Sequence, residues 1–169
     1  SFTVQPVILP SARFAEFKSH LMLFFTGLSR LSSDVAATFV PALSSREKCI
    51  RRFMAMVEEA VGILHSGDLR DFGQLLDEAW QIKRSLSQSV STSEIDSAYA
   101  AAKKAGALGG KLLGAGGGGF MMLFAEPHNH ESVKKTLAGY LHVPFHFEPS
   151  GSQIVHYDPE QDYSDLDNA

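Results

Sequence analysis

The residues best suited to chemistry lie in a glycine-rich stretch, GALGGKLLGAGGGGFMMLFAE, at residues 106–126. Five glycines follow Lys111 in this stretch, namely Gly114, Gly116, Gly117, Gly118 and Gly119. Glycine has no Cβ, so it reaches left-handed dihedral angles that other residues avoid. The stretch is typical of a loop whose backbone amides surround a phosphate, with Lys111 facing the same group. The alternatives are a tight structural connection for the glycines and an ordinary surface position for Lys111.

Two familiar nucleotide-binding motifs do not fit this stretch. Gly114, Gly116 and Gly119 satisfy the spacing G-x-G-x-x-G, but that motif follows a strand and opens a helix. Here a predicted helix precedes the glycines, and a short apolar strand, FMMLFAE, follows them. A Walker loop also fails, because Ala105 replaces its first glycine and Leu112 replaces the hydroxyl residue after the lysine. We therefore expect a glycine loop that leads from a helix into a strand.

Further candidates for substrate binding are two pairs of neighbouring residues and one arginine. Lys83 and Arg84 lie on a predicted helix, and Arg30 follows a predicted strand. An ammonium or guanidinium group suits a phosphate group, although a solvated helix face is the alternative. Thr26 and Gly27 end the strand before Arg30, where a substrate contact or ordinary turn hydrogen bonding would be expected.

The histidines and the single cysteine do not predict a metal site or a nucleophile. His128 and His130 stand near Glu126 in a predicted loop without the usual spacing of metal ligands. Cys49 has no neighbouring base and lies on a predicted helix, so we expect an inert thiol. One cysteine also excludes an internal disulfide and suits a reducing compartment.

Several elements must position these residues. The pattern predicts strands at 20–27 and 120–126, a hairpin over 143–158 that turns at 149–151, and helices over 11–17, 34–40, 44–67, 68–86, 91–106 and 130–141. Capping patterns place helix starts at Ser44, Asp68 and Ser91, and Gly67 ends the helix that starts at Ser44. The opening residues 1–10 contain two prolines, so a strand there would lie at a sheet edge. This order predicts an α+β fold in which helices cover one face of a sheet.

Composition limits the classes of function. The 169 residues are 44% hydrophobic and 20% charged, which predicts a globular domain over residues 1–160 with an acidic, mobile tail at 161–169. A net charge of -4 disfavours a general nucleic-acid binder. The apolar runs are too short to cross a bilayer, so we expect a cytoplasmic protein with no membrane partner.

The glycine stretch also resembles the third signature motif of the GHMP kinases, the superfamily of galactokinase, homoserine kinase and mevalonate kinase. Residues 21–35, 79–107 and 143–160 are similar to the C-terminal half of sugar kinases that act on D-glycero-D-manno-heptose 7-phosphate. The resemblance covers most of the chain, and it implies a ferredoxin-like domain with an antiparallel sheet covered by helices. It places the glycine loop beside the phosphate loop of an N-terminal kinase domain.

The resemblance implies ATP and Mg2+ as cofactors and a sugar phosphate as substrate. Nothing in this sequence matches the N-terminal phosphate loop of the PxxxGLGSSA type, so we expect the ATP-binding half to be missing and identify no catalytic residue in this chain. Two alternatives remain open. One is a stand-alone module that binds a phosphosugar or nucleotide without catalysis, and the other is a dimerisation half that forms a homodimer.

Overall fold

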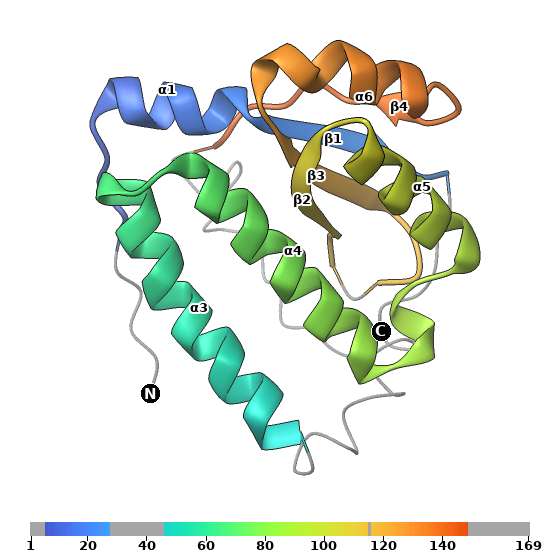
Figure 1. The fold of residues 1–169 in the computed structure, drawn as a ribbon, viewed down its shortest axis with the longest axis horizontal. Coiled ribbons are helices and arrows are strands. Elements are labelled where there is room, and N and C mark those ends of the chain that lie inside the picture. The colour runs from blue at the N-terminus through green and yellow to red at the C-terminus, as the bar shows by residue number, and fades with distance from the viewer. Residues whose placement is uncertain (1–5, 28–45, 115, 149–169) are drawn as a thin grey trace, which may run out of the picture.

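The computed structural model describes residues 6–27, 46–114 and 116–148 (Figure 1). In chain order its elements are α1 (Ser11–Ser19), β1 (Leu21–Phe25), α3 (Glu47–Ser66), α4 (Leu69–Leu86), η2 (Gln88–Val90), α5 (Ser93–Lys104), β2 (Ala107–Leu112), β3 (Phe120–Ala125), η3 (Pro127–Asn129), α6 (His130–Thr136) and β4 (Leu141–His142). Helices packed on an antiparallel sheet confirm the predicted α+β class. In these ranges no helix is both long and apolar enough to cross a bilayer.

The four strands form one sheet in the order β2-β3-β1-β4. In the central pair, Leu21 lies opposite Phe124 and Phe25 opposite Phe120. Strands β2 and β4 form the two edges, so they are separated by about 14 Å, three times the usual strand spacing. Residues that project from these two edges therefore belong to different sites.

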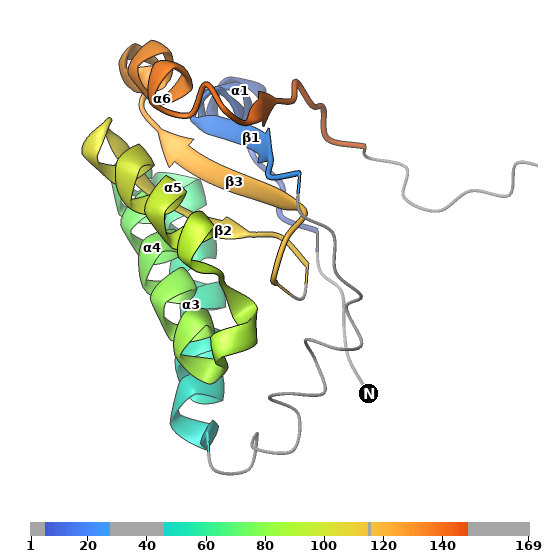
Figure 2. The same cartoon turned by 90° about the vertical axis from the view of Figure 1, so that its right-hand side faces the viewer.

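The larger of two hydrophobic clusters lies between the sheet and helices α5 and α6. Met22 and Leu123 face Ala98 of α5 and Val133 of α6 in this cluster, and Trp80 of α4 joins it. The second cluster lies on the opposite face of the sheet, where Phe124 packs with residues of α4 and with Phe17 of α1. Helix α4 can serve both clusters because it runs beside the β2 edge, with α3 as its neighbour (Figure 2). The helices thus cover one face and also part of the other.

The helix termini follow the predicted chemistry in part. Gly67 ends α3, and the Asp68 side chain caps α4 by accepting a hydrogen bond from the backbone N–H of Arg70 at 2.9 Å. The cap of α5 was predicted wrongly, because Thr92 accepts from the N–H of Ile95 and Ser91 does not. Helix α3 begins at Glu47 without a side-chain cap, and the predicted cap Ser44 lies outside the described residues.

The prediction that the glycine loop leads directly from a helix into a strand was wrong. Residues 107–112 form strand β2, so the glycines connect two antiparallel strands as a hairpin. Glycine is unfavourable in strands, and the pattern therefore gave no sign of β2. The packing of α4 explains the strand, because a Cβ added to Gly109 would lie 1.9 Å from the carbonyl oxygen of Gly73. The backbones of α4 and β2 can approach this closely because both contact positions, Gly73 and Gly109, are glycine.

The outer segments also differ from the prediction. Residues 6–10 contain no strand, and helix α6 ends at Thr136 instead of continuing to 141. The expected strand after Val143 is replaced by the two-residue β4, extended by one hydrogen bond from the Val143 N–H to the Leu23 carbonyl. Pro144 cannot donate to the next position of the ladder. The predicted helix at 34–40, the turn at 149–151 and the tail at 161–169 lie outside the described residues.

Replacing Gly109 by alanine should lower the free energy of unfolding by about 1–3 kcal/mol or more, because the new methyl group would overlap the backbone of α4. Gly62→Ala is the matched control, since a Cβ there, inside exposed α3, meets no atom within 4 Å. That control should raise stability by about 0.5–1 kcal/mol through helix propensity. Urea denaturation of both variants measures the difference. Equal stabilities would contradict the proposed close packing.

Candidate functional site

The glycine loop between β2 and β3 is fixed to two other segments. At the end of β1, the backbone N–H and the side-chain hydroxyl of Thr26 both donate to the Gly119 carbonyl, each at 2.9 Å. On the other side, the Gly117 N–H donates to the Val90 carbonyl in η2 at 2.9 Å. The loop is therefore held in place by β1 and η2 before any ligand arrives.

The backbone conformation of this loop requires glycine. Gly114, Gly116, Gly117 and Gly119 have φ angles of 71°, 121°, 75° and 93°, in the region that other residues rarely adopt. A Cβ on Gly116 would also lie 2.6 Å from the Val90 carbonyl oxygen. The glycines thus allow both the turn and the close approach of η2. Their contact with a phosphate remains a prediction.

Lys83 reaches from the last turns of α4 to the base of the loop. Its ammonium group donates to the Gly114 carbonyl and, at 3.4 Å, to the Leu112 carbonyl. Burial lowers the pKa of Lys83, and the positive charge of Lys111 lowers it further. An anion bound nearby would offset both effects, because it would favour the charged form of the amine.

Lys111 projects from β2 on the side of α3 and α4. It borders an apolar pocket of about 260 Å³ whose walls include Phe53, Val57 and Ala79. Within the described part of the chain, neither Lys111 nor Lys83 forms an ion pair with a carboxylate. Two ammonium groups without a carboxylate partner among the described residues therefore lie at the glycine-loop end of β2.

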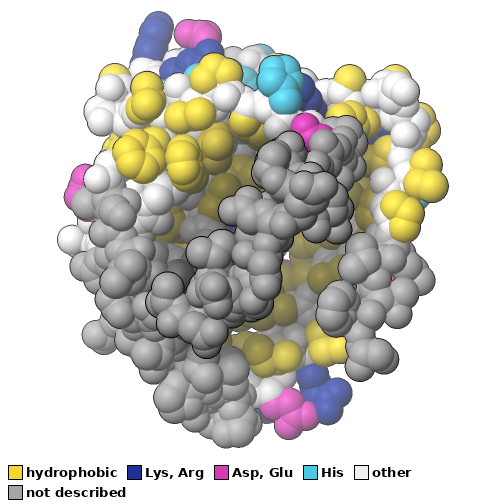
Figure 3. Space-filling model, turned by 180° about the vertical axis from the view of Figure 1, so that it is seen from behind, with side chains coloured by type: hydrophobic (Ala, Val, Ile, Leu, Met, Phe, Trp, Pro, Cys, Tyr) yellow, Lys and Arg dark blue, Asp and Glu magenta, His cyan; other side chains and the backbone are white. Residues whose placement is uncertain are grey.

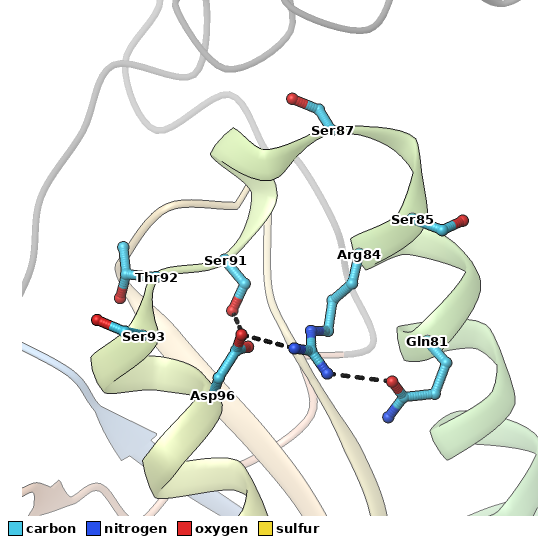
Figure 4. Close-up of a pocket in the computed structure, with 8 residues that line it drawn as sticks. All are labelled: Gln81, Arg84, Ser85, Ser87, Ser91, Thr92, Ser93 and Asp96. Atoms are coloured by element: carbon cyan, nitrogen blue, oxygen red, sulfur yellow. Dashed lines mark hydrogen bonds and ion pairs between the residues drawn. The ribbon is translucent and has the colours of Figure 1, made fainter.

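A polar pocket of about 570 Å³ lies next to the loop, between the end of α4 and the start of α5 (Figure 4). It is lined by Gln81, Arg84, Ser85, Ser87, Ser91, Thr92, Ser93 and Asp96. Segment η2 joins its two walls, and the same segment holds the loop through Val90. The pocket and the loop therefore share one structural support.

Arg84 and Asp96 face each other across this pocket (Figure 4). The guanidinium of Arg84 donates to the Asp96 carboxylate at 2.6 Å and to the Gln81 side chain at 3.1 Å. The Ser91 hydroxyl donates to the other carboxylate oxygen at 2.6 Å. The charge of Arg84 is thus balanced, and the pocket offers a ligand hydroxyl groups and a neutral ion pair. Such a surface suits a polyhydroxylated molecule.

A second polar network fixes the two helices that flank the pocket. Asp77 of α4 accepts hydrogen bonds from the Tyr99 hydroxyl and the Lys103 ammonium of α5. Burial alone would raise the pKa of Asp77, but the hydrogen bonds from Tyr99, Gln81 and Lys103 lower it below its usual value. Burial raises the pKa of Tyr99, and the bond to the Asp77 carboxylate raises it further. Asp77 therefore stays ionised and Tyr99 protonated, which keeps α4 and α5 in register.

The structure brings most of the predicted site residues to one end of the sheet. Thr26 donates hydrogen bonds to the loop, and the next residue, Gly27, has a φ of 73°. Lys83 and Lys111 lie at the β2 end of the loop. Arg84 lies in the adjoining pocket, while Arg30 is outside the described residues. Their roles in binding remain predictions. The histidines of the predicted loop lie elsewhere, where His130 contacts the Ala125 carbonyl through Nε2 at 3.1 Å.

Sequence reasoning missed the Ser91–Asp96–Arg84 network and the carbonyl of Val90. It assigned Ser91 to a helix cap, because that interpretation used only local spacing. The available signal was the density of hydroxyl residues in SLSQSVSTSEIDS at residues 85–97, next to Arg84.

Comparisons with known proteins establish the family. Residues 48–141 match the family model described as GHMP kinases C terminal, which is more than half of the chain, so the chain belongs to this family. It is 30% identical over 137 residues to the D-glycero-alpha-D-manno-heptose 7-phosphate kinase of Campylobacter jejuni, covering 79% of this chain and 40% of that protein. It is 26% identical over 127 residues to the bifunctional fucokinase/GDP-fucose pyrophosphorylase of Arabidopsis thaliana, covering 73% of this chain and 12% of that protein.

Solved structures agree with this assignment. The crystal structure of L. major mevalonate kinase in complex with R-mevalonate superposes with a TM-score of 0.64 and 25% identity, over 70% of this chain and 37% of that one. The chain therefore spans less than half the length of the kinases described here. The predicted membership of the GHMP kinases is confirmed.

Replacing Lys83 by methionine should loosen the glycine loop, because the loop loses its hydrogen bonds from the ammonium group. Hydrogen bonds to charged groups stabilise by about 1.5 kcal/mol or more, so amides of the loop should exchange about tenfold faster with deuterium. Lys135→Met on exposed α6 is the matched control and should leave this exchange unchanged. Identical exchange of the Gly117 amide in both variants would show that Lys83 does not hold the loop.

Proposed function

We propose that this chain is the C-terminal domain, over residues 1–160, of an ATP-dependent sugar kinase. The intact enzyme transfers the γ-phosphoryl group of ATP to a sugar hydroxyl, the anomeric hydroxyl of D-glycero-D-manno-heptose 7-phosphate. The observation that supports this substrate is the 30% identity to a heptose 7-phosphate kinase over 79% of this chain. Because ATP and sugar phosphates are metabolites of the cell interior, we place the enzyme in the cytoplasm.

The glycine loop suits the phosphate end of this reaction. Phosphoryl transfer depends on positioning and on stabilising negative charge. The loop is held rigidly by Thr26 and Val90, and the ammonium groups of Lys83 and Lys111 lack carboxylate partners among the described residues. We assign ATP phosphates to this end of β2, with Gly114 and Gly116–Gly119 permitting the close approach of a second phosphate loop.

The polar pocket suits the sugar. Its hydroxyl groups can bind sugar hydroxyls, and Arg84 can meet the distal phosphate by exchanging its partner Asp96 for a phosphate oxygen. Thr26, Gly27 and Arg30 remain further candidates for substrate contacts at the end of β1.

The residues that the structure describes do not form a magnesium site. The described part of the chain contains no group of three His, Cys, Asp or Glu side chains that could hold a metal ion. In the proposed enzyme, the ligands of Mg2+ and the group that deprotonates the acceptor come from an N-terminal ATP-binding half. A homodimer of the complete kinase is compatible with this division.

The direct test compares this chain with the complete kinase. With ATP, Mg2+ and D-glycero-D-manno-heptose 7-phosphate, the complete enzyme should form product, because it contains both sides of the phosphate site. The 169-residue chain alone should give no product above background. A coupled assay of ADP release measures both. Sustained turnover by the chain alone would contradict the half-enzyme proposal, and failure of the complete enzyme with this sugar would contradict the substrate.

Arg84→Ala in the complete kinase tests the sugar pocket. Loss of a charge-assisted hydrogen bond of about 1.5 to 3 kcal/mol should raise the KM for the phosphorylated sugar by roughly 10- to 150-fold while the KM for ATP stays nearly constant. The matched control is Arg70→Ala, because Arg70 lies at the other end of α4 and pairs with Glu126. Steady-state kinetics with each substrate varied separates the two effects. Equal changes in both KM values would reject Arg84 as the contact of the distal phosphate.

A further inference from the structure

A third pocket concentrates basic groups at the β4 edge of the sheet. It has a volume of about 280 Å³ and is lined by Lys18, Ser19, Leu21, Leu23, His130, Lys134, His142, Val143, Pro144, Phe145 and His146. We call it the basic pocket. Two lysines and three histidines contribute to its wall, and none of its lining residues is a carboxylate. It lies across the sheet from the glycine loop, which extends from the β2 edge.

The basic groups come from separate elements and meet at this edge. Lys18 lies on α1, His142 on β4, His146 in the segment after β4, and His130 and Lys134 on α6. Figure 3 shows His together with Lys or Arg side chains along the upper rim of the molecule, where α1 and α6 lie in Figure 1. Their convergence is therefore a result of the tertiary fold, since 128 residues separate Lys18 from His146.

Two contacts define the charge state of the pocket. The Lys18 ammonium lies 2.8 Å from Nδ1 of His146, so the amine donates and the imidazole accepts as a neutral ring. Lys134 pairs with Glu131 at 3.0 Å on the outer side of α6. Glu131 is the acidic group that acts on His142, and it lies outside the lining of the pocket.

His142 is the group most affected by this surplus of positive charge. Burial lowers its pKa, and the charges of Lys134 and His130 lower it further, while Glu131 acts in the opposite direction. The imidazole also packs against the ring of Phe24 with a centroid distance of 5.3 Å, which holds it in place. A group with negative charge in the pocket would relieve the repulsion among these cations.

We propose that the basic pocket binds a small multivalent oxyanion of the phosphate class, as orthophosphate, a phosphomonoester or a diphosphate. Ammonium and imidazole N–H donors from α1, α6 and the β4 segment suit the oxygen atoms of such an ion. The volume lies at the lower limit of ordinary small-molecule sites, roughly 300–1,000 Å³, so it suits a phosphate group better than a whole nucleotide. Binding here does not compete with a ligand at the glycine loop, because the two sites are on opposite edges of the sheet.

Binding should be linked to proton uptake. The anion favours the protonated form of His142, so the lowered pKa of this imidazole should rise when it binds. The phosphoryl group also loses a proton, with a second pKa of about 6, so the linkage is followed on the His142 resonance and not on affinity alone.

The test is an NMR titration of the 169-residue chain with sodium phosphate, sodium pyrophosphate or glycerol phosphate, against sodium chloride at equal ionic strength. Phosphate should shift the imidazole resonances of His130, His142 and His146 in a saturable way, because these rings line the pocket. Preference for pyrophosphate would identify a diphosphate ligand, and equal binding of the two monophosphates would identify a single phosphoryl group. Equal shifts with chloride, or no saturable shift, would overturn the proposal.

Variants locate the site. Lys134→Gln and His142→Gln should each weaken phosphate binding by about tenfold or more, as expected for lost charge-assisted contacts. Lys135→Gln, next to Lys134 on α6 but outside the pocket, is the matched control and should bind as the parent chain does. If His142→Gln fails to fold, the pair Lys134→Gln and Lys135→Gln decides the question. Equal losses in this pair would reject the basic pocket as the site.

Discussion

The contact between the backbones of α4 and β2 is the constraint on which the rest of the structure depends. Gly73 and Gly109 lie so close that neither position tolerates a Cβ without displacing its neighbours. This contact places the whole length of α4 beside the sheet edge. One helix can therefore bury Trp80 in the larger core, direct Lys83 to the base of the glycine loop and present Arg84 to the polar pocket. A shift of α4 away from β2 would move all three side chains together, because they share one rigid element.

Glycine has two distinct roles in the same stretch of sequence. In β2, Gly109 gives α4 room, and its value lies in the absence of a side chain. In the hairpin loop, Gly114, Gly117 and Gly119 have positive φ angles, so they are needed for the backbone conformation. Thr26 and Val90 then fix the loop from opposite sides, which reduces the conformational entropy that a bound phosphate would have to overcome.

Local sequence patterns predicted the elements that depend on local physics. Apolar periodicity and the residues Gly67 and Asp68 placed the α3–α4 hairpin, because caps and amphipathic faces act over a few residues. Strand β2 was missed, since its stability comes from α4 and β3 and not from strand propensity. The site shows the same division. The glycine motif identified the loop, but the ion pair of Arg84 with Asp96 depends on how α4 and α5 pack, which no spacing rule contains.

Charge compensation distinguishes the two halves of the proposed substrate site. Arg84 is balanced by Asp96, so the polar pocket presents hydroxyl groups and an internal ion pair to its ligand. Lys83 and Lys111 repel each other, and within the described residues neither has a carboxylate partner. An anion therefore gains more at the glycine loop than in the pocket, because there it removes an existing repulsion instead of breaking an ion pair. This difference favours an orientation in which a reacting phosphate lies against the loop and the hydroxyl-bearing body of the sugar occupies the pocket.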